Sequence, residues 1–393
     1  MTVEQTVWRP ASDAPEPGEQ RVTPLELFFD LVFVFAITQV TALISADLTW
    51  QGLARGMLVL AAIWWSWTGY AWLTNAIDPE AVRARLAMLL AMAAMLIVAI
   101  ATPRAFGEDA VLFGCAYLAV RGLHLIIFSA ATRDDPEVHH AVGLLARRIA
   151  IPPLLILGAA FLDGWPQVAL WVVALLLDYG GAARSESYGF QVAPGHFAER
   201  HGLIIIIALG ESVVAIGAGA AGSAIGSGKI TAAVLGLVVA AAIWWAYFDV
   251  VAPVAERRLR RAEGAERAAL ARDSYSYIHL LMVAGIVLFA LGAKKTLAHV
   301  GDELHAVAAF ALCCGCALYL VGQLAFRLRN LGTWNRQRAV AAVLLAAVTP
   351  LALVIPALAT LAIVAAIWIV LVAYEAIRFR EARARVRREQ PAR

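Results

Sequence analysis

The residues of this chain that could do chemistry are carboxylates placed inside long apolar runs. The stretch PLELFFDLVFVFAITQV, residues 24–40, holds Glu26 and Asp30 one helical turn apart. Two more acids, Asp178 and Glu211, lie within later apolar runs. An ionised side chain near the middle of a membrane costs at least about 2.5–3.5 kcal/mol, so it is normally paired or functional. We therefore take these four acids as candidate binding sites for an ion or a proton.

Basic side chains in neighbouring apolar runs nearly balance these acids. The candidate charge partners are Arg121, His124, Arg147 and Arg148. With a rise of about 1.5 Å per residue, Asp30, Asp178 and the two adjacent arginines lie about 8–12 Å from the same end of their runs, so they could meet. Two interpretations remain open. The groups form buried ion pairs that orient the helices, or they line a polar path.

The first apolar run carries further polar residues on the face of its two acids. Thr38, Thr41 and Ser45 continue the stripe of Glu26 and Asp30, and the apolar Val34 interrupts it. This follows from the helical period of 3.6 residues. Hydroxyl side chains also join helices in membranes, so the stripe has a structural interpretation as well. We treat the three hydroxyl residues as candidates for lining a pathway.

The stretch HFAERHGLIIIIALGES, residues 196–212, is the second dense group of polar residues. Glu211 lies in an apolar segment where small neighbours permit close helix packing. Because burial disfavours the charged form of a carboxylate, such a group suits uptake and release of a proton; a neutral, hydrogen-bonded glutamate is the alternative. His196 and Glu199, three residues apart, are expected to form a salt-bridged helix start and not a metal site.

Composition sets the class of protein. Of 393 residues 62% are hydrophobic and 16% charged, and the mean hydropathy is +0.75. Soluble domains carry about 25% charged residues. Continuous apolar runs of about 20 residues cross a hydrocarbon core of about 30 Å, and they lack the alternation of a β-barrel. The sequence therefore predicts an all-α polytopic membrane protein in a lipid bilayer.

The apolar runs predict about twelve transmembrane helices arranged as two parallel six-helix repeats. The pentapeptide AAIWW at residues 61–65 recurs at residues 241–245, in the second span of each half. We expect a polar N-terminal tail at 1–20, a first repeat at 21–183, a second repeat at 184–378 and a basic C-terminal tail at 379–393. The expected spans are 24–45, 52–74, 83–102, 109–131, 140–162, 165–183, 201–221, 230–252, 276–297, 303–326, 338–356 and 358–378.

The distribution of basic residues predicts the orientation. With both termini inside, the cytoplasmic segments hold 24 of the 32 Lys and Arg residues, and the outer segments hold five. Cytoplasmic loops carry this excess in membrane proteins. The polar, proline-rich residues 1–20 do not resemble a cleavable signal, so the first span is expected to stay in the membrane. We expect a multi-pass protein of the cytoplasmic membrane with both termini in the cytoplasm.

Four motifs resemble the bacterial low temperature requirement protein A (LtrA) family. They are VTPLELFFDLVFVFA (22–36), HFAERHGLIIIIALGES (196–212), AAIWWAYFD (241–249) and YIHLLMVAGI (277–286). The resemblance covers nearly the whole chain. It implies a bacterial inner-membrane protein associated with growth in the cold.

A weaker similarity points to the lysosomal potassium channel family. Phe28, Phe29 and Asp30, with Arg21 upstream, are similar to the Arg…Phe-Ser-Asp signature of that family's first helix. Here Phe29 replaces the serine, and the second half offers Leu-Gly-Glu at 209–211 instead of a Phe-x-Asp motif.

The preferred hypothesis is a transporter or channel that handles a proton or a small cation. Asp30 and Glu211 would bind the ion or proton, and Arg121, Arg147 and Arg148 would balance their charge. Two other classes remain open: a membrane-embedded enzyme that uses the same acids on a lipid-like substrate, and a scaffold or sensor that transports nothing.

Several chemistries find no support in the sequence. It has no phosphate-cradling glycine loop and no Gly-x-Ser-x-Gly elbow. The basic runs lack the aromatic residues of a nucleic-acid-binding domain. Cys313, Cys314 and Cys316 are expected to pack in a helix and not to bind metal. We expect no metal, no cofactor and no nucleic-acid partner.

Overall fold

The protein is a bundle of long apolar helices. The computed structural model describes residues 21–76, 81–131, 149–184, 192–220 and 226–380. Within these ranges no β-strand is present, and nine helices are long and apolar enough to cross a membrane. The prediction of an all-helical, multi-pass membrane protein is confirmed.

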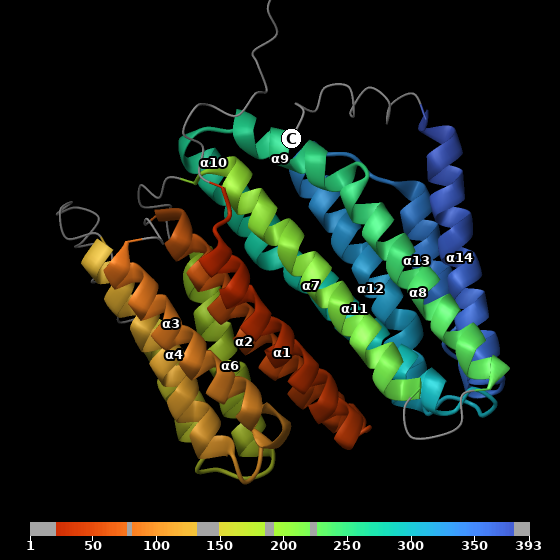
Figure 1. Ribbon diagram of the computed structural model, residues 1–393, viewed down its shortest axis with the longest axis horizontal. Helices are drawn as coiled ribbons and strands as arrows, with labels where there is room; N and C mark the ends of the chain where they lie inside the picture. The colour runs from red at the N-terminus through yellow and green to blue at the C-terminus, as the bar shows by residue number, and fades with distance from the viewer. Residues whose placement is uncertain (1–20, 77–80, 132–148, 185–191, 221–225, 381–393) are drawn as a thin grey trace, which may run out of the picture.

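One group of helices comes from the first half of the chain (Figure 1). Its members are α1 (Pro24–Ala46), α2 (Trp50–Ala76), α3 (Val82–Ala101), the short η1 (Thr102–Arg104), α4 (Ala110–Ala131) and α6 (Trp165–Arg184). A shorter apolar helix, Ile149–Ala159, lies between α4 and α6 in the sequence. Helix α1 packs against α2 and α3, and α2 packs against α4 and α6.

The second group begins with α7 and lies beside α1 (Figure 1). It contains α7 (Pro194–Ala220), α8 (Ser227–Phe248), α9 (Val251–Arg261), α10 (Gly264–Leu270), the π-helical η2 (Ala271–Ile278), α11 (His279–Ala298), α12 (Ala306–Leu331), α13 (Arg336–Ala347), η3 (Leu351–Leu353) and α14 (Ala357–Arg378). The segments α10, η2 and α11 form one continuous helical stretch of 35 residues.

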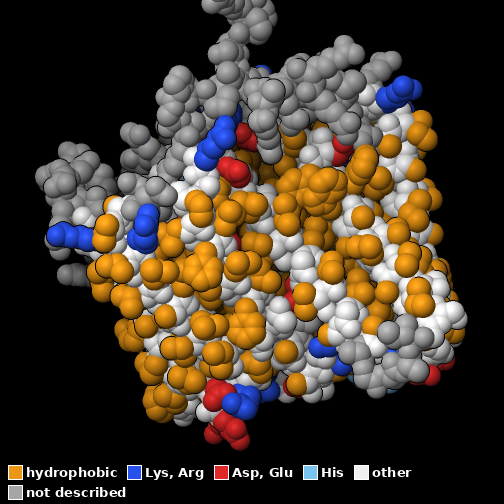
Figure 2. Space-filling model, viewed as in Figure 1, with side chains coloured by type: hydrophobic (Ala, Val, Ile, Leu, Met, Phe, Trp, Pro, Cys, Tyr) orange, Lys and Arg blue, Asp and Glu red, His pale blue; other side chains and the backbone are white. Residues whose placement is uncertain are grey.

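The surface has the distribution of side chains that a bilayer requires. Hydrophobic side chains cover the middle of the visible face, and charged side chains gather mostly toward its two ends (Figure 2). Large apolar residues such as Leu90, Leu176 and Val370 are more than 60% exposed along their helices. Because water would penalise such a surface, these faces are suited to lipid. Exposed tryptophans stand at helix ends, at Trp50, Trp165 and Trp334, as in interfacial aromatic belts.

The start of α1, the end of α14 and the arginine-rich α9 lie at one end of the bundle, which we call the α9 end (Figure 1). A chain that begins and ends on the same side crosses an even number of times. Helices α2 and α6 occupy two more of the twelve expected spans, and the fifth, 140–162, is described only from residue 149. The count of twelve in two repeats stays a prediction.

Three further details concern the expected spans and repeats. Helix α7 begins at Pro194 and not near residue 201, because Pro suits the first helical turn. The basic segment at 257–261, which lies between the expected spans 230–252 and 276–297, belongs to the amphipathic helix α9. The two Trp-Trp pairs differ in environment: Trp64 and Trp65 are buried, whereas Trp244 and Trp245 are 44% and 38% exposed. The two copies of the pentapeptide therefore differ in their surroundings.

Helices α11 and α12 pack closely together, and glycines permit this approach. A β-carbon on Gly285 would lie 2.6 Å from the backbone nitrogen of Tyr319 and 2.7 Å from the carbonyl oxygen of Gly315. A β-carbon on Gly292 would lie 2.5 Å from the backbone nitrogen of Leu312. Small residues at such positions let two backbones approach and gain van der Waals contact where no hydrophobic driving force exists between membrane helices.

We predict that Gly285→Ala destabilises the protein by about 1–3 kcal/mol, because overpacking forces α11 and α12 apart. The matched control is Gly217→Ala, since a β-carbon at Gly217 meets no atom within 4 Å. Unfolding of both variants in detergent should show a loss for Gly285→Ala alone. Equal behaviour of the two variants would contradict the packing role of this glycine.

Candidate functional site

The first turn of α1 fixes the position of the first candidate acid. Thr23 caps the helix and Pro24 occupies its first position. The Thr23 backbone nitrogen donates to Glu26 Oε2 (2.9 Å), and the Glu26 backbone nitrogen donates to Thr23 Oγ1 (3.4 Å). This reciprocal capping box satisfies two backbone donors at the helix start. It also holds the Glu26 carboxylate at the α9 end of the bundle, facing α7.

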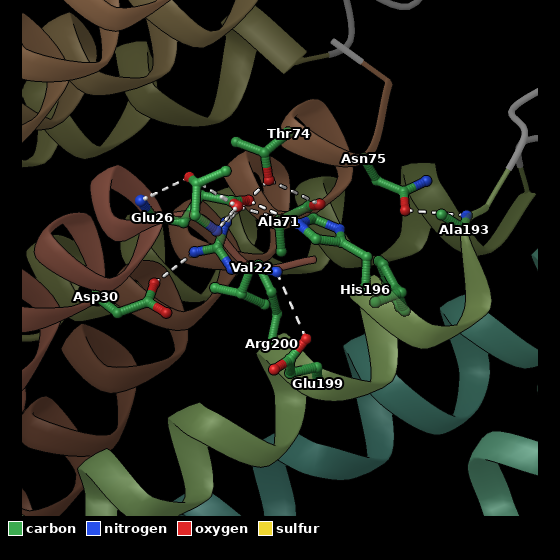
Figure 3. A network of polar contacts seen from close by, with 12 residues as sticks. Val22, Glu26, Asp30, Ala71, Thr74, Asn75, Ala193, His196, Glu199 and Arg200 are labelled. Atoms are coloured by element: carbon green, nitrogen blue, oxygen red, sulfur yellow. Dashed lines mark hydrogen bonds and ion pairs between the residues drawn. The ribbon is translucent and has the colours of Figure 1, made fainter. Parts of the chain in front are cut away.

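Glu26 binds two residues of α7 (Figure 3). His196 Nε2 lies 2.9 Å from Glu26 Oε1, and Arg200 Nη1 donates to the same oxygen at 3.0 Å. The expected salt bridge between His196 and Glu199 was therefore wrong. Glu199 is exposed and instead accepts a hydrogen bond from the backbone nitrogen of Val22 at 3.5 Å.

Arg200 links Glu26 to the second acid of α1 (Figure 3). Its Nη2 donates to Asp30 Oδ1 at 2.5 Å, and its Nη1 also donates to Thr74 Oγ1 of α2 at 2.9 Å. Trp67 of α2 donates from Nε1 to the same Asp30 oxygen at 2.9 Å. The Arg200 guanidinium carbon lies 5.7 Å from the centre of the Trp67 ring, within the range of a cation–π contact.

We call Glu26, Asp30, His196 and Arg200 the ionic cluster. All four side chains are fully buried. The cluster contains two carboxylates, one guanidinium and one imidazole, so its charge is zero only when it carries one proton beyond those of Arg200. Within the described part of the chain, Asp30 Oδ2, Arg200 Nε and His196 Nδ1 have no hydrogen-bond partner. These unsatisfied atoms leave capacity for a proton, a water molecule or an ion.

Sequence reasoning found Asp30 and Glu26 but missed their partners. The expected first span of the second half started at residue 201, which placed His196 and Arg200 outside the membrane. One signal was available: His196 and Arg200 are four residues apart, as Glu26 and Asp30 are. Two such pairs on adjacent parallel helices can form matching contacts one turn apart. Arg21, noted in the channel-like signature, is exposed, and the arginine that pairs with Asp30 comes from α7.

Glu211 lies farther along the same α1–α7 contact and is 2% exposed. Thr38 Oγ1 donates to Glu211 Oε2, and also to the Val34 carbonyl at 3.1 Å. Beyond it, Lys295 Nζ donates to the Ser45 carbonyl at 3.2 Å. The structure thus places Thr38 and Ser45 in polar contacts with the second half, and Thr41 is buried nearby on the same helix. Arg121 is not the partner of Glu211.

A separate buried ion pair lies within the first half. Arg121 Nη2 of α4 donates to Asp178 Oδ1 of α6 at 2.8 Å, and both side chains are at most 4% exposed. His124 is buried one turn from Arg121 and contacts the ring of Tyr70 at 5.4 Å between centroids. Asp178 is therefore paired with Arg121 and is not a member of the ionic cluster. Arg147 and Arg148 lie outside the described residues.

The ionic cluster borders a group of buried aromatic and histidine rings. The rings of His201 and Trp67 lie 4.9 Å apart, and those of His201 and His279 lie 5.3 Å apart. Tyr247 hydrogen-bonds His279 Nε2 at 2.9 Å. The π-helical η2 contributes carbonyls to this region: Ser276 accepts from Trp64 Nε1 at 2.7 Å. A π-helical turn releases such carbonyls from regular pairing and is frequent at functional sites.

The arrangement of charged side chains is suited to holding charge. Within the ranges that the structure describes, no group of three His, Cys, Asp or Glu side chains is arranged to hold a metal ion. Cys313 and Cys316 are buried in α12. The ionic cluster instead offers carboxylate oxygens compensated by one arginine, at the junction of α1, α2 and α7.

These features define a class: a polytopic α-helical membrane protein whose two groups of helices are joined by a buried ionic cluster. Comparison with known proteins gives the family. Residues 21–373 match the family described as bacterial low temperature requirement A protein (LtrA), and the chain belongs to that family. It is also 30% identical over 288 residues to the uncharacterized protein RA0937 of Rhizobium meliloti (strain 1021), covering 70% of this chain and 69% of that protein.

We predict that Arg200→Met lowers the free energy of unfolding by about 3–5 kcal/mol, because it leaves two buried carboxylates without their common partner. Adding Asp30→Asn to Arg200→Met should recover part of that loss, since contacting residues couple. Unfolding in detergent measures both effects. Arg104→Gln is the control, because its ion pair is exposed and should matter little. Simple additivity of the two cluster substitutions would contradict the coupling.

Proposed function

We propose that the protein moves a proton or a small cation across the membrane, as a transporter or a channel, through the contact between α1 and α7. The carrying observation is the fully buried ionic cluster, in which two carboxylates share one guanidinium. Charges are retained in a membrane interior where they face one another or a path for ions. This cluster joins the two groups of helices, where sites of duplicated membrane transport proteins lie.

Charge counting supports an exchangeable positive charge. With Glu26 and Asp30 ionised and His196 neutral, the cluster carries a net charge of about −1, the positive charge of Arg200 included. A proton on His196, or a cation beside the unpaired Asp30 oxygen, restores neutrality. In a low-dielectric interior the charged and the neutral states of the cluster differ greatly in free energy. The cluster therefore favours holding one positive charge and can release it only when another group or water compensates.

The rest of the proposed path follows one face of α1. The polar stripe runs from Glu26 and Asp30 to Thr38, where Glu211 faces it, and on to Thr41 and Ser45. Val34 is the apolar step between the ionic cluster and Glu211. We propose Asp30 and Glu211 as the two acids that the proton or cation visits in turn. Arg200 takes the role of charge partner that was expected of Arg147 and Arg148.

Helix packing supports the proposed duplication. Helix α1 contacts α2 and α3, α3 contacts α4, and α2 contacts α6. In the second half α7 contacts α8 and α11, α11 contacts α12, and α8 contacts α14. These four neighbour pairs match if α7, α8, α11, α12 and α14 repeat the first, second, third, fourth and sixth helices. The contacts of Glu26, Asp30 and Thr38 with His196, Arg200 and Glu211 show that α1 and α7 run parallel.

We further propose that the α9 end faces the cytoplasm, in the bacterial inner membrane. The arginines of α9 and the end of α14 lie there (Figure 1), and such residues stay on the cytoplasmic side. The ionic cluster then opens the path from the cytoplasm, and Ser45 lies toward the outside.

We predict a flux of protons or of potassium in proteoliposomes that contain the protein and carry a pH or potassium gradient. Asp30→Asn and Glu211→Gln should each reduce that flux roughly tenfold or more, since each removes a charge on which the proposed path depends. Glu108→Gln is the control, because the Glu108 side chain is 87% exposed at a helix end. The flux is followed with an internal pH dye or a potassium electrode.

Folding of each variant is checked by gel filtration and thermal unfolding before the flux is compared. If the wild-type protein, Asp30→Asn and Glu211→Gln all leak at the rate of lipid alone, the transport proposal fails.

A second prediction concerns access of water to the α1 stripe. In a protein whose four cysteines are replaced, a single cysteine at Thr41 or Ser45 should react with a membrane-impermeant thiol reagent. A cysteine at Leu31 or Phe35 should not, because those side chains are exposed on the apolar face of α1 that is suited to lipid. The rate of labelling in vesicles is the measurement. Equal labelling of both faces, or of neither, contradicts a polar path along the stripe.

A further inference from the structure

A hollow opens between α9 and the last turns of α12, at the α9 end of the bundle. It is small and open on one side, with a cavity volume of about 30 Å³. Six of its eight lining residues are apolar, and the other two are Arg327 and Asn330. The apolar residues are Val250, Val251, Val254, Ala255, Phe326 and Leu331. A small, open hollow with a mostly apolar lining suits a few methylene groups of an aliphatic chain whose polar or charged end lies at Arg327.

Arg327 gives the hollow a net positive charge. Within the described residues it makes one hydrogen bond, from Nε to Thr333 Oγ1 at 3.0 Å, and it interacts electrostatically with Arg338 and Glu375. Glu375, however, is already held by Arg338, which donates to both carboxylate oxygens at 2.8 Å. Two guanidinium groups therefore face one carboxylate, and among the residues that the structure describes one positive charge remains uncompensated.

Several other arginines at this end of the bundle have acids of their own. Arg258 pairs with Glu266, and Arg260 pairs with Glu256 at 2.8 Å. Arg329 pairs with Asp273 at 3.0 Å. Arg327 differs from these because Glu375, the described acid with which it interacts, is bound by Arg338. Its planar group presents several donors that match the oxygens of a phosphate.

The hollow lies where a bilayer surface would meet the protein. Leu328, Leu331 and Trp334 are between 40% and 57% exposed at the end of α12. Helix α9 is amphipathic: Pro253, Ala255 and Leu259 are buried against the bundle, and basic residues fill its last turn. Such a helix lies in the plane of the membrane surface, with its basic face among the headgroups. An aliphatic chain could thus reach the hollow directly from the bilayer.

We propose that this hollow binds an anionic phospholipid of the surrounding leaflet, with its phosphate on Arg327 and part of an acyl chain between α9 and α12. The net positive charge selects an anionic headgroup over a zwitterionic one, because the latter brings no net charge to neutralise. This inference does not depend on the transport proposal. The site concerns residues that neither the ionic cluster nor the α1 stripe uses.

The test is native mass spectrometry of the full-length protein in detergent, titrated with phosphatidylglycerol or phosphatidylcholine. We expect phosphatidylglycerol to remain bound in preference to phosphatidylcholine. Arg327→Gln should weaken phosphatidylglycerol binding roughly tenfold, the loss of one charge-assisted contact, and abolish the preference. Val254→Trp should have a similar effect by filling the hollow while Arg327 remains.

Matched controls separate the site from general charge and general bulk. Arg378→Gln removes an exposed cation at the same end of the bundle, and Val213→Trp adds the same bulk on an exposed face of α7; neither should change the binding. All variants must match the wild type in thermal unfolding. The proposal is overturned if Arg327→Gln and Arg378→Gln behave alike, if Val254→Trp binds lipid normally, or if excess inorganic phosphate displaces the lipid, which would indicate a site for free phosphate.

Discussion

The structure depends on charge compensation between α1 and α7 in a medium that cannot solvate ions. The buried carboxylates of Glu26 and Asp30 in α1 are stabilised by their contacts with Arg200, His196 and Trp67. Thr74 helps to hold Arg200 in place by accepting a hydrogen bond from it. Each of these contacts comes from another helix. The cluster therefore constrains the rotation and the register of α1 and α7 together, because a shift of either helix by one residue would leave a charge without a partner.

Compensation in the cluster is incomplete, and that incompleteness is what suggests a function. A structural ion pair would need one acid for one base, as Arg121 and Asp178 have. The cluster instead has two acids on one arginine, with a histidine beside them. An arrangement that is neutral only with one additional positive charge is well suited to binding and releasing that charge. The buried rings of Trp67, His201 and His279 lie beside it.

The contact between α1 and α7 is supported by the close packing of α11 and α12. The close approach of α11 and α12, at Gly285 and Gly292, leaves no space for side chains between their backbones. Helix α11 in turn packs against α7, so this helix pair supports the helix that supplies His196, Arg200 and Glu211. Close packing of α11 and α12 behind α7 stabilises the polar contact between α1 and α7 within the bundle.

The sequence by itself determined the class of the protein and the positions of its unusual groups. Apolar runs predicted the helices, charged residues within them identified Glu26, Asp30, Asp178 and Glu211, and periodicity placed Thr38, Thr41 and Ser45 on the face of the first two. The tertiary structure decided the partners. Arg200 and His196 meet the acids of α1, Arg121 pairs with Asp178, and Thr38 meets Glu211. Periodicity tells which face of a helix is polar, whereas the neighbour across that face depends on how helices distant in sequence pack.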